Sequence, residues 1–175
     1  AERARERGDP ELAAGRALPA GELLARTGDW TRLEALARDE MERCATLHMI
    51  YEEAWARLLL ARALLATGRE EDAALEARQA LESAQRSDLR GIVWRASAWL
   101  AESFGDRDPE LLTVAADGLE RFVEGFSAEE RSAYLTGSGA DALLGAWWER
   151  ARKAKATAVV ERLAAMRQQL HPVRS

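Results

Sequence analysis

The sequence predicts an all-helical fold, and three observations lead to this prediction. The 175 residues include 36 Ala and 24 Leu but only six Val and two Ile, so helix-favouring residues far outnumber the β-branched residues that favour strands. Only four Pro and 12 Gly interrupt the chain. Apolar residues recur at helical spacing between short turn segments. One domain over residues 1–175 is expected, because a chain of this length buries a substantial core.

Capping signals and turn residues divide the chain into successive helices. Asp9 and Asp108 each place an N-cap carboxylate ahead of a first-turn proline, and residues 127–130 have the pattern of a capping box. The last helix is expected to be kinked or split, because its apolar stripe loses phase near Val159. The predicted helices, in order, are 10–17, 20–27, 30–47, 50–67, 69–86, 89–104, 109–125, 128–135 and 140–170.

Three glycines recur at matching places along these helices. Gly28, Gly68 and Gly105 are separated by 40 and 37 residues, and each follows an apolar run and precedes a charged residue. These are the positions of helix C-caps, so the spacing indicates a repeat. In residues 54–87, small alanine side chains recur on both sides of the turn and allow two antiparallel helices to approach closely. This segment is therefore predicted to form a helical hairpin.

Residues 54–87 resemble a tetratricopeptide repeat. The resemblance rests on the family's pattern of large and small residues around a turn glycine, here Leu60–Ala61, Leu64, Gly68, Ala73, Ala77 and Ala80–Leu81. Residues 20–41 form a weaker copy, in which Glu40 stands where a small residue is expected. Residues 92–119 form a third.

The resemblance covers residues 20–122 and is to a divergent form of the repeat. The spacings exceed the family's usual length of about 34 residues, and the proline that normally ends the second helix is missing. The resemblance implies a short solenoid of stacked antiparallel hairpins, with residues 127–175 as C-terminal capping helices. It also suggests a helical domain of a multidomain bacterial regulatory or signalling protein. Since the chain opens with Ala1, we expect a fragment whose flanking domains serve as partners.

The resemblance also implies where a partner would bind. In this family the first helix of each hairpin lines a concave surface, and the corresponding positions here include Arg26, Trp55, Arg62, Arg95 and Trp99. Guanidinium groups beside aromatic faces can hold carboxylates through paired hydrogen bonds and stacking. These five residues are therefore predicted to bind a protein or peptide partner, and replacing Arg62 and Arg95 by Ala is expected to weaken its capture.

Residues that would carry catalysis or hold a cofactor are not indicated. His48 and His171 have no neighbouring Cys or His at zinc-binding spacing. Residues 137–142 match the letters of a dinucleotide-binding loop but follow a helical segment and not a strand, so a linker is predicted. We therefore expect no catalytic residue, no metal and no cofactor.

The charge balance bears on partners and location. A net charge of -5 and an isoelectric point near 5.3 argue against nucleic acid as the main partner. Residues 150–175 nevertheless hold seven basic side chains against one acidic one, which leaves an acidic partner or nucleic acid as an alternative for this end. Cys44 is the single cysteine, and neither a membrane-spanning run nor a signal peptide is present, so a cytoplasmic protein is expected.

The function predicted from these observations is a non-catalytic interaction or scaffolding module. One alternative is a small-ligand sensor of a transcriptional or signalling regulator, with a tryptophan-lined cavity between helices. Another is a homo-oligomerisation module. Adjacent helical residues point about 100° apart, so Trp147 and Trp148 cannot both face one patch of core, and one of them could pair the final helix with its mate in a homodimer.

Overall fold

The computed structural model describes residues 10–170, with side chains from residue 17 onward. Asp9 and His171, which the sequence singled out, lie outside this range. The described residues form nine helices and no strand, so the all-α prediction is confirmed. The helices are α1 (Pro10–Thr27), α2 (Trp30–Leu47), α3 (Ile50–Ala66), α4 (Glu70–Arg86), α5 (Arg90–Phe104), α6 (Glu110–Val123), α7 (Ala128–Gly137), α8 (Ala140–Lys153) and α9 (Thr157–Leu170).

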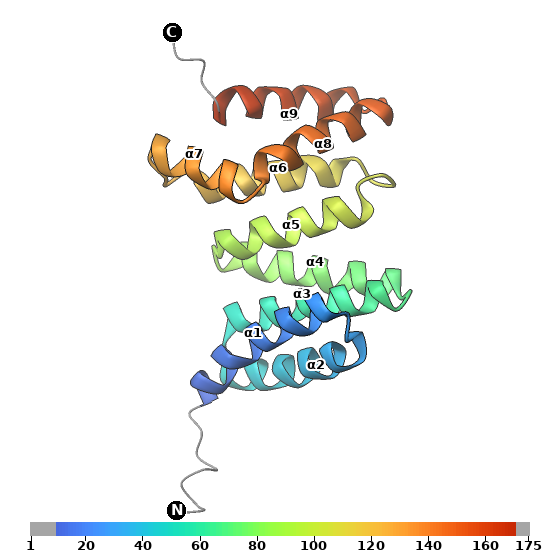
Figure 1. The fold of residues 1–175 in the computed structure, drawn as a ribbon, viewed down its shortest axis with the longest axis vertical. Helices are drawn as coiled ribbons and strands as arrows, with labels where there is room; N and C mark the ends of the chain where they lie inside the picture. Colours follow the sequence, from blue (N-terminus) through green and yellow to red (C-terminus); the bar gives the residue numbers. More distant parts are fainter. Residues whose placement is uncertain (1–9, 171–175) are drawn as a thin grey trace, which may run out of the picture. The chain divides into compact units, whose positions relative to one another are not determined.

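The chain divides into two compact units, Ala1–Ile92 and Val93–Ser175. The N-terminal unit contains α1 to α4, and the C-terminal unit contains most of α5 and all of α6 to α9. Within the units, helices that follow one another in sequence pack as antiparallel pairs (Figure 1).

In the N-terminal unit, α1 packs against both α2 and α3, α2 packs against α3, and α3 packs against α4. Small side chains make this close packing feasible: Ala61 and Ala77 are fully buried. At Gly21 of α1 a Cβ atom would lie only 2.5 Å from Leu59 Cδ1 of α3, so the two helices approach too closely for a side chain there. The hairpin predicted around Gly68 is confirmed.

The backbone repeats with a period of 40 residues. The first six helices begin at residues 10, 30, 50, 70, 90 and 110. The turn inside each of the first two hairpins places a glycine in the left-handed region, Gly28 with a φ of 76° and Gly68 with a φ of 81°. After each hairpin a second left-handed residue follows, His48 with a φ of 57° and Asp88 with a φ of 50°.

The predicted break between helices 10–17 and 20–27 is wrong, because α1 runs unbroken through Pro19. A proline in a helix interior removes one backbone hydrogen bond and crowds the preceding turn. Packing on either side of the proline offsets this cost: Ala17 and Ala25 are buried, and Gly21 lies against α3. The helix therefore continues through the proline.

The predicted split of the last helix is confirmed. Helix α8 ends at Lys153 and α9 begins at Thr157, with Lys155 left-handed in the turn between them at a φ of 57°. The new helix restores the apolar face, because Val159, Leu163 and Met166 are all buried.

The capping predictions have mixed outcomes. The capping box is confirmed: the Glu130 N–H donates to Ser127 Oγ (3.2 Å), and the Ser127 N–H donates to Glu130 Oε2 (2.8 Å). The predicted side-chain cap at Asp108 is wrong, because α6 begins after Pro109 without a side-chain cap bond. Gly105 is not left-handed. It is needed for space, since a Cβ there would lie 2.4 Å from the Ala101 carbonyl oxygen and 2.9 Å from Leu112 Cδ2.

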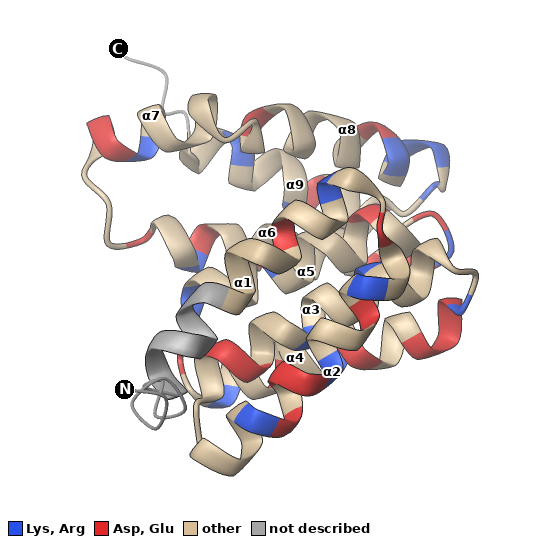
Figure 2. Cartoon of the chain, turned by 60° about the horizontal axis from the view of Figure 1, so that its bottom comes forward, with Lys and Arg blue, Asp and Glu red and all other residues tan. Residues whose placement is uncertain are grey.

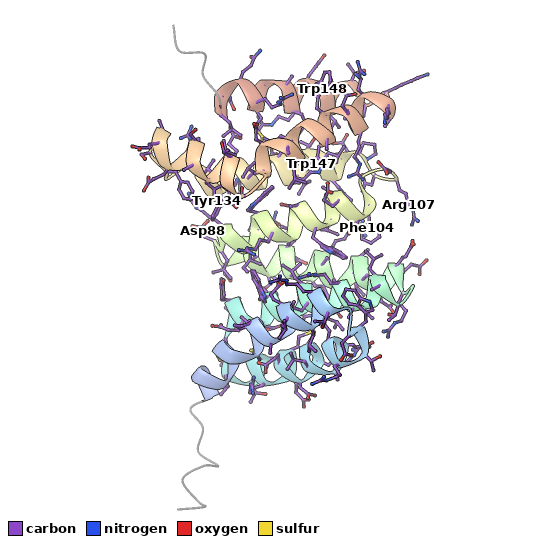
Figure 3. The ribbon with its side chains drawn as sticks, viewed as in Figure 1. Asp88, Phe104, Arg107, Tyr134, Trp147 and Trp148 are labelled. Atoms are coloured by element: carbon purple, nitrogen blue, oxygen red, sulfur yellow. The ribbon has the colours of Figure 1, made fainter. Side chains whose placement is uncertain are left out.

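Aromatic side chains form a connected chain in the C-terminal unit. Trp94 of α5 lies edge-on to Trp147 of α8, with ring centroids 5.9 Å apart, and its Nε1–H donates to Tyr134 Oη of α7 at 2.8 Å. Tyr134 in turn contacts Phe122 and Phe126, with centroid distances of 5.1 Å and 5.9 Å. Figure 3 labels Tyr134 and Trp147 within this unit. These contacts connect α5, α6, α7 and α8.

Candidate partner-binding site

A hollow of about 290 Å³ lies between α1 and α3 in the N-terminal unit. Its lining residues come from one turn of α1 and from the beginning of α3: Leu18, Pro19, Glu22, Tyr51 and Trp55. One of these, Trp55, is among the residues predicted to bind a partner. One wall of the hollow consists of Leu18, Pro19 and Glu22. They lie together because α1 continues through Pro19 and packs on α3.

Two aromatic rings form the α3 wall of the hollow. Tyr51 and Trp55 are four residues apart, so they lie on the same face of α3. Their ring centroids are 6.4 Å apart, and their planes are inclined by only 19°. Tyr51 is 46% exposed and Trp55 is half-buried. Two nearly parallel rings therefore lie on one face of a helix that is well packed elsewhere, where Ala54 and Leu58 are buried.

An ion pair crosses from α1 to α3 beside these rings. Arg62 Nη1 donates to Glu22 Oε2 at 2.8 Å, and both side chains are about one-third exposed. Glu22 and Arg62 are 40 residues apart, so they occupy the same position in successive hairpins. The carboxylate of Glu22 lines the hollow, and the Arg62 guanidinium is engaged with it. A partner carboxylate at Arg62 would therefore have to compete with Glu22.

The other predicted binding residues are distributed over both units. Arg26 is exposed on α1, one turn beyond Glu22. Arg95 is exposed on α5 of the C-terminal unit, and Trp99, also on α5, is half-buried with its ring edge-on to Phe104 at 5.8 Å. The structure thus connects Trp55 and Arg62 through Glu22, while Arg95 and Trp99 belong to the other unit.

Sequence reasoning missed four residues of the hollow, namely Leu18, Pro19, Glu22 and Tyr51. The spacing of Tyr51 four residues before Trp55 was an available signal for a shared helix face. Leu18 and Pro19 lie at the predicted break between helices 10–17 and 20–27, so sequence reasoning does not include them in a helical wall. The offset between Glu22 and Arg62 equals the spacing of Gly28 and Gly68, but it does not show that the two side chains meet.

A second hollow, of about 340 Å³, lies in the C-terminal unit among α6, α7 and α9. Charged and polar side chains dominate its lining, which consists of Glu120, Arg121, Val123, Glu124, Arg131, Gln169 and Leu170. The small-ligand alternative predicts an apolar cavity lined by tryptophan. The lining of this hollow is mainly charged and polar and contains no tryptophan.

Two of the basic residues near the C-terminal end, Arg150 and Arg162, are paired with acids of their own unit. Figure 2 shows the basic run at the end of α8. Arg150 pairs with Asp106 at 2.7 Å and with Glu102 at 3.3 Å. Arg162 pairs with Asp117 at 2.7 Å and with Glu120 at 2.6 Å, and the hydrogen bond from Glu120 raises the pKa of its guanidinium. An acidic partner would have to compete with these acids for the guanidinium groups of Arg150 and Arg162.

The two adjacent tryptophans of α8 have separate environments, as their angular separation requires. Trp147 is fully buried, and its Nε1–H donates to Glu102 Oε1. Trp148 is half-buried and lies under the Arg152 guanidinium, which is 5.2 Å from its ring centroid. Figure 3 shows the two side chains on different sides of α8.

The segment with the letters of a dinucleotide loop covers the last residue of α7, a turn at Ser138 and Gly139, and the first residues of α8. Gly139 is left-handed at a φ of 75°, and Ser138 Oγ accepts a hydrogen bond from the Ala140 N–H at 3.3 Å. A helix and not a strand precedes the turn, and the predicted linker is confirmed only at Ser138 and Gly139. Among the residues with described coordinates, no three His, Cys, Asp or Glu side chains gather in a way that could hold a metal ion. None of the described helices is long and apolar enough to cross a membrane.

No protein-family model matches the chain, and comparisons with curated proteins and with solved structures find no significant similarity. The family resemblance at residues 54–87 is therefore supported only by the helical hairpin and by the residues that form it. Arguments about function have to come from the hollow and its surroundings.

Proposed function

We propose that this protein is a non-catalytic interaction module that binds a peptide segment of a partner protein on the α1–α3 face of its N-terminal unit. The observation that carries the proposal is the pair of nearly parallel rings of Tyr51, which is exposed, and Trp55, which is half-buried, at a hollow of peptide side-chain size. The finer fold assignment, a short solenoid related to tetratricopeptide repeats in a regulatory or signalling protein, belongs to this proposal as well.

Physical considerations favour a binding role for these rings. Aromatic side chains bury large areas at low entropic cost, and for this reason Tyr and Trp dominate the energetics of protein interfaces. A single exposed aromatic side chain is unremarkable, but two rings that share a helix face beside a hollow form a contiguous apolar surface. The rings project from α3, which packs against three other helices, so the surface is preorganised.

The proposal is tested by selecting peptides from a random display library against the full chain. Affinities of the selected peptides are then measured by calorimetry for the wild type and for Tyr51→Ala and Trp55→Ala. Each substitution removes an anchoring ring, so we expect each to weaken binding by at least tenfold, or about 1.4 kcal/mol.

Leu75→Ala is the matched control, because Leu75 is an exposed apolar residue of the same unit on α4, with 53% of its surface accessible. It is expected to leave the affinity unchanged. Circular dichroism establishes that all variants retain their helical content. Selected peptides whose affinity is indifferent to both Tyr51→Ala and Trp55→Ala would show that this face is not the binding site.

A further inference from the structure

One face of α1 is exposed where the equivalent face of α3 is buried. Ala20 and Leu23 of α1 are exposed, and Leu23, with 60% of its surface accessible, is the most exposed large apolar side chain among those that the structure describes. The 40-residue period makes Leu60 and Ala63 the equivalent residues of α3. Both are fully buried. Two helices of the same repeat therefore differ on one face, and α1 presents apolar surface there.

The neighbours of the two helices explain this difference. Helix α3 has α2 before it and α4 after it in the sequence, and it packs closely against both. Helix α1 has α2 after it, as α3 has α4. Among the described residues, no helix takes the place beside α1 that α2 holds beside α3. The face that is covered in α3 is therefore open in α1.

The exposed residues of this face are contiguous. Leu23 is three residues after Ala20 and four after Pro19, which is also exposed, so the three lie on neighbouring turns of one side of α1. Leu59, the equivalent of Pro19, is only 2% exposed. Single exposed apolar side chains are common in folded proteins, but a contiguous apolar patch marks an interaction surface.

Helix α9 of the C-terminal unit lacks such a patch. It packs against α6 and α8, and its exposed side chains are polar or small, among them Glu161, Ala165 and Gln168. A polar outer face of this kind is what a helix at the end of a repeat array requires in water. The face of α1 around Leu23 does not have this character and resembles an interface instead.

We infer that this face of α1 binds an amphipathic helix of a partner protein, in the manner in which α2 packs on α3. The inference extends the α2–α3 interface by one period, so the chemistry of the partner helix follows from α2 and α4. Both bury small or apolar side chains at positions i, i+4 and i+11: Leu33, Ala37 and Cys44 in α2, and Ala73, Ala77 and Ala84 in α4. The partner helix has a stripe of Ala and Leu at this spacing and polar residues elsewhere.

The patch also differs in shape from its equivalent on α3. In α3 a large residue, Leu60, precedes a small one, Ala63, by three positions. In α1 the order is reversed, with Ala20 before Leu23. A helix whose side chains fit α3 therefore fits α1 less closely, and exchanging the two sizes on α1 should improve the fit.

The test uses a helical peptide copied from residues 29–48, the segment that packs on α3. Glu40→Ala and Cys44→Ala give the copy the residues found in α4. Ala35→Lys allows a lactam bridge to Asp39; both positions are exposed on α2, and the bridge offsets the low helicity of a short isolated helix. An N-terminal trifluoroacetyl group reports binding to the full chain by fluorine NMR. We expect saturable binding with a dissociation constant below about 1 mM.

Two controls address the stripe and the patch. A peptide that also carries Leu33→Gln and Ala37→Gln lacks the stripe and should bind about tenfold more weakly or worse. Leu23→Glu in the full chain should weaken binding of the intact peptide to the same extent, whereas Leu75→Glu, at an exposed position of α4, should leave it unchanged. Leu23 is exposed while α2 is in its own place, so exchange of α2 for the peptide would not depend on it.

A third comparison tests the equivalence between α1 and α3. The double variant Ala20→Leu with Leu23→Ala restores the order of sizes found in α3 and should tighten binding about threefold. Circular dichroism establishes that the variants retain their helical content.

The inference is overturned if the intact peptide does not bind, if the peptide without the stripe binds equally well, if Leu23→Glu has no effect, or if the double variant binds no more tightly than the wild type. It is also overturned if the full chain alone forms a dimer that Leu23→Glu abolishes in analytical ultracentrifugation, because a second copy then covers the face. Leu23 does not line the hollow at Tyr51 and Trp55, so this inference and the proposed function fail independently.

Discussion

Helices α2 and α4 occupy equivalent places in successive hairpins but bury different chemistry at one position. Residues 31–40 and residues 71–80 have the same succession of buried, half-buried and exposed side chains. At the tenth position of each stretch, α4 buries Ala80 with no accessible surface and α2 buries Glu40 with 5%. The repeat is therefore specified by register and by a shared apolar face, and it tolerates an ionisable group at one of its closest-packed positions.

The structure shows how α2 accommodates this carboxylate. Arg43, one turn later, donates through Nη2 to Glu40 Oε1. The accommodation is incomplete, because the buried Glu40 Oε2 and Arg43 Nε have no hydrogen-bond partner. In α4 the residue equivalent to Arg43 is Ser83, which cannot make this pair. A buried carboxylate at this position of the repeat is therefore accompanied by a compensating cation on the same helix.

The largest expected effect comes from transferring the charge to α4. Ala80→Glu places a carboxylate at a fully buried site without a cation, so we expect the free energy of unfolding, measured by urea denaturation, to fall by about 3 kcal/mol or more. The double variant Ala80→Glu with Ser83→Arg supplies the α2 arrangement and should recover part of the loss. If the double variant is no more stable than Ala80→Glu alone, the accommodation in α2 does not depend on Arg43.

A smaller effect is expected from dismantling the pair in α2. Arg43→Ala leaves the Glu40 charge buried without a partner and should lower the free energy of unfolding by about 2–4 kcal/mol. Glu40→Ala leaves Arg43 free to reach solvent, because its side chain is 35% exposed, and it restores the residue found in α4. This variant should be within about 1 kcal/mol of the wild type, on either side. Equal losses in the two variants, in the same urea measurement, would contradict the asymmetry.

The smallest effect concerns a second difference between the helices, Glu34 of α2, where α4 has Ala74. Hydrogen bonds from Arg69 lower the pKa of Glu34 from 4.5 to about 2, and Arg69 Nη1 lies 3.0 Å from Glu34 Oε1. A carboxylate with a depressed folded-state pKa stabilises the fold above its unfolded pKa and loses that contribution as pH falls through the folded value. The contribution is therefore complete above about pH 4.5 and is lost on the way to pH 2.

Glu34→Gln removes this contribution at every pH. Because the Arg69 side chain is 40% exposed, solvent screening limits the difference from wild type to about 1 kcal/mol near neutral pH. We expect the difference to shrink as pH falls from 4.5 toward 2, in urea titrations at several pH values. A difference that stays constant over this interval would mean that the Arg69 contact does not stabilise the ionised carboxylate.

Much of the fold was predictable because the relevant signals are local. The turn glycines Gly28 and Gly68, the small residues around them and the capping box at Ser127 each correspond to an observed turn, packing contact or cap. The predictions failed where distant contacts decide the outcome. Pro19 lies inside α1 although it removes a helix hydrogen bond, and two residues later Gly21 packs against Leu59 of α3.

The candidate site was less predictable for a related reason. Trp55 could be identified from its place in the repeat, but the role of Arg62 depends on Glu22, which is 40 residues earlier on another helix. A sequence shows that an arginine is present and does not show that a neighbouring hairpin has already neutralised it. The 40-residue spacing of Gly28 and Gly68 makes the two positions equivalent, but only the packing of α1 on α3 brings the two side chains together.

The constant repeat length restricts how this polypeptide can change in size. Deleting residues 29–68 would join Gly28 directly to Arg69 and remove one whole repeat, so that every later helix would keep its buried side facing inward. A deletion of one residue within a helix turns everything after it by about 100° and exposes that side to water. Over the first six helices we therefore expect changes in length to be accepted in steps of 40 residues, and other sizes only within the turns.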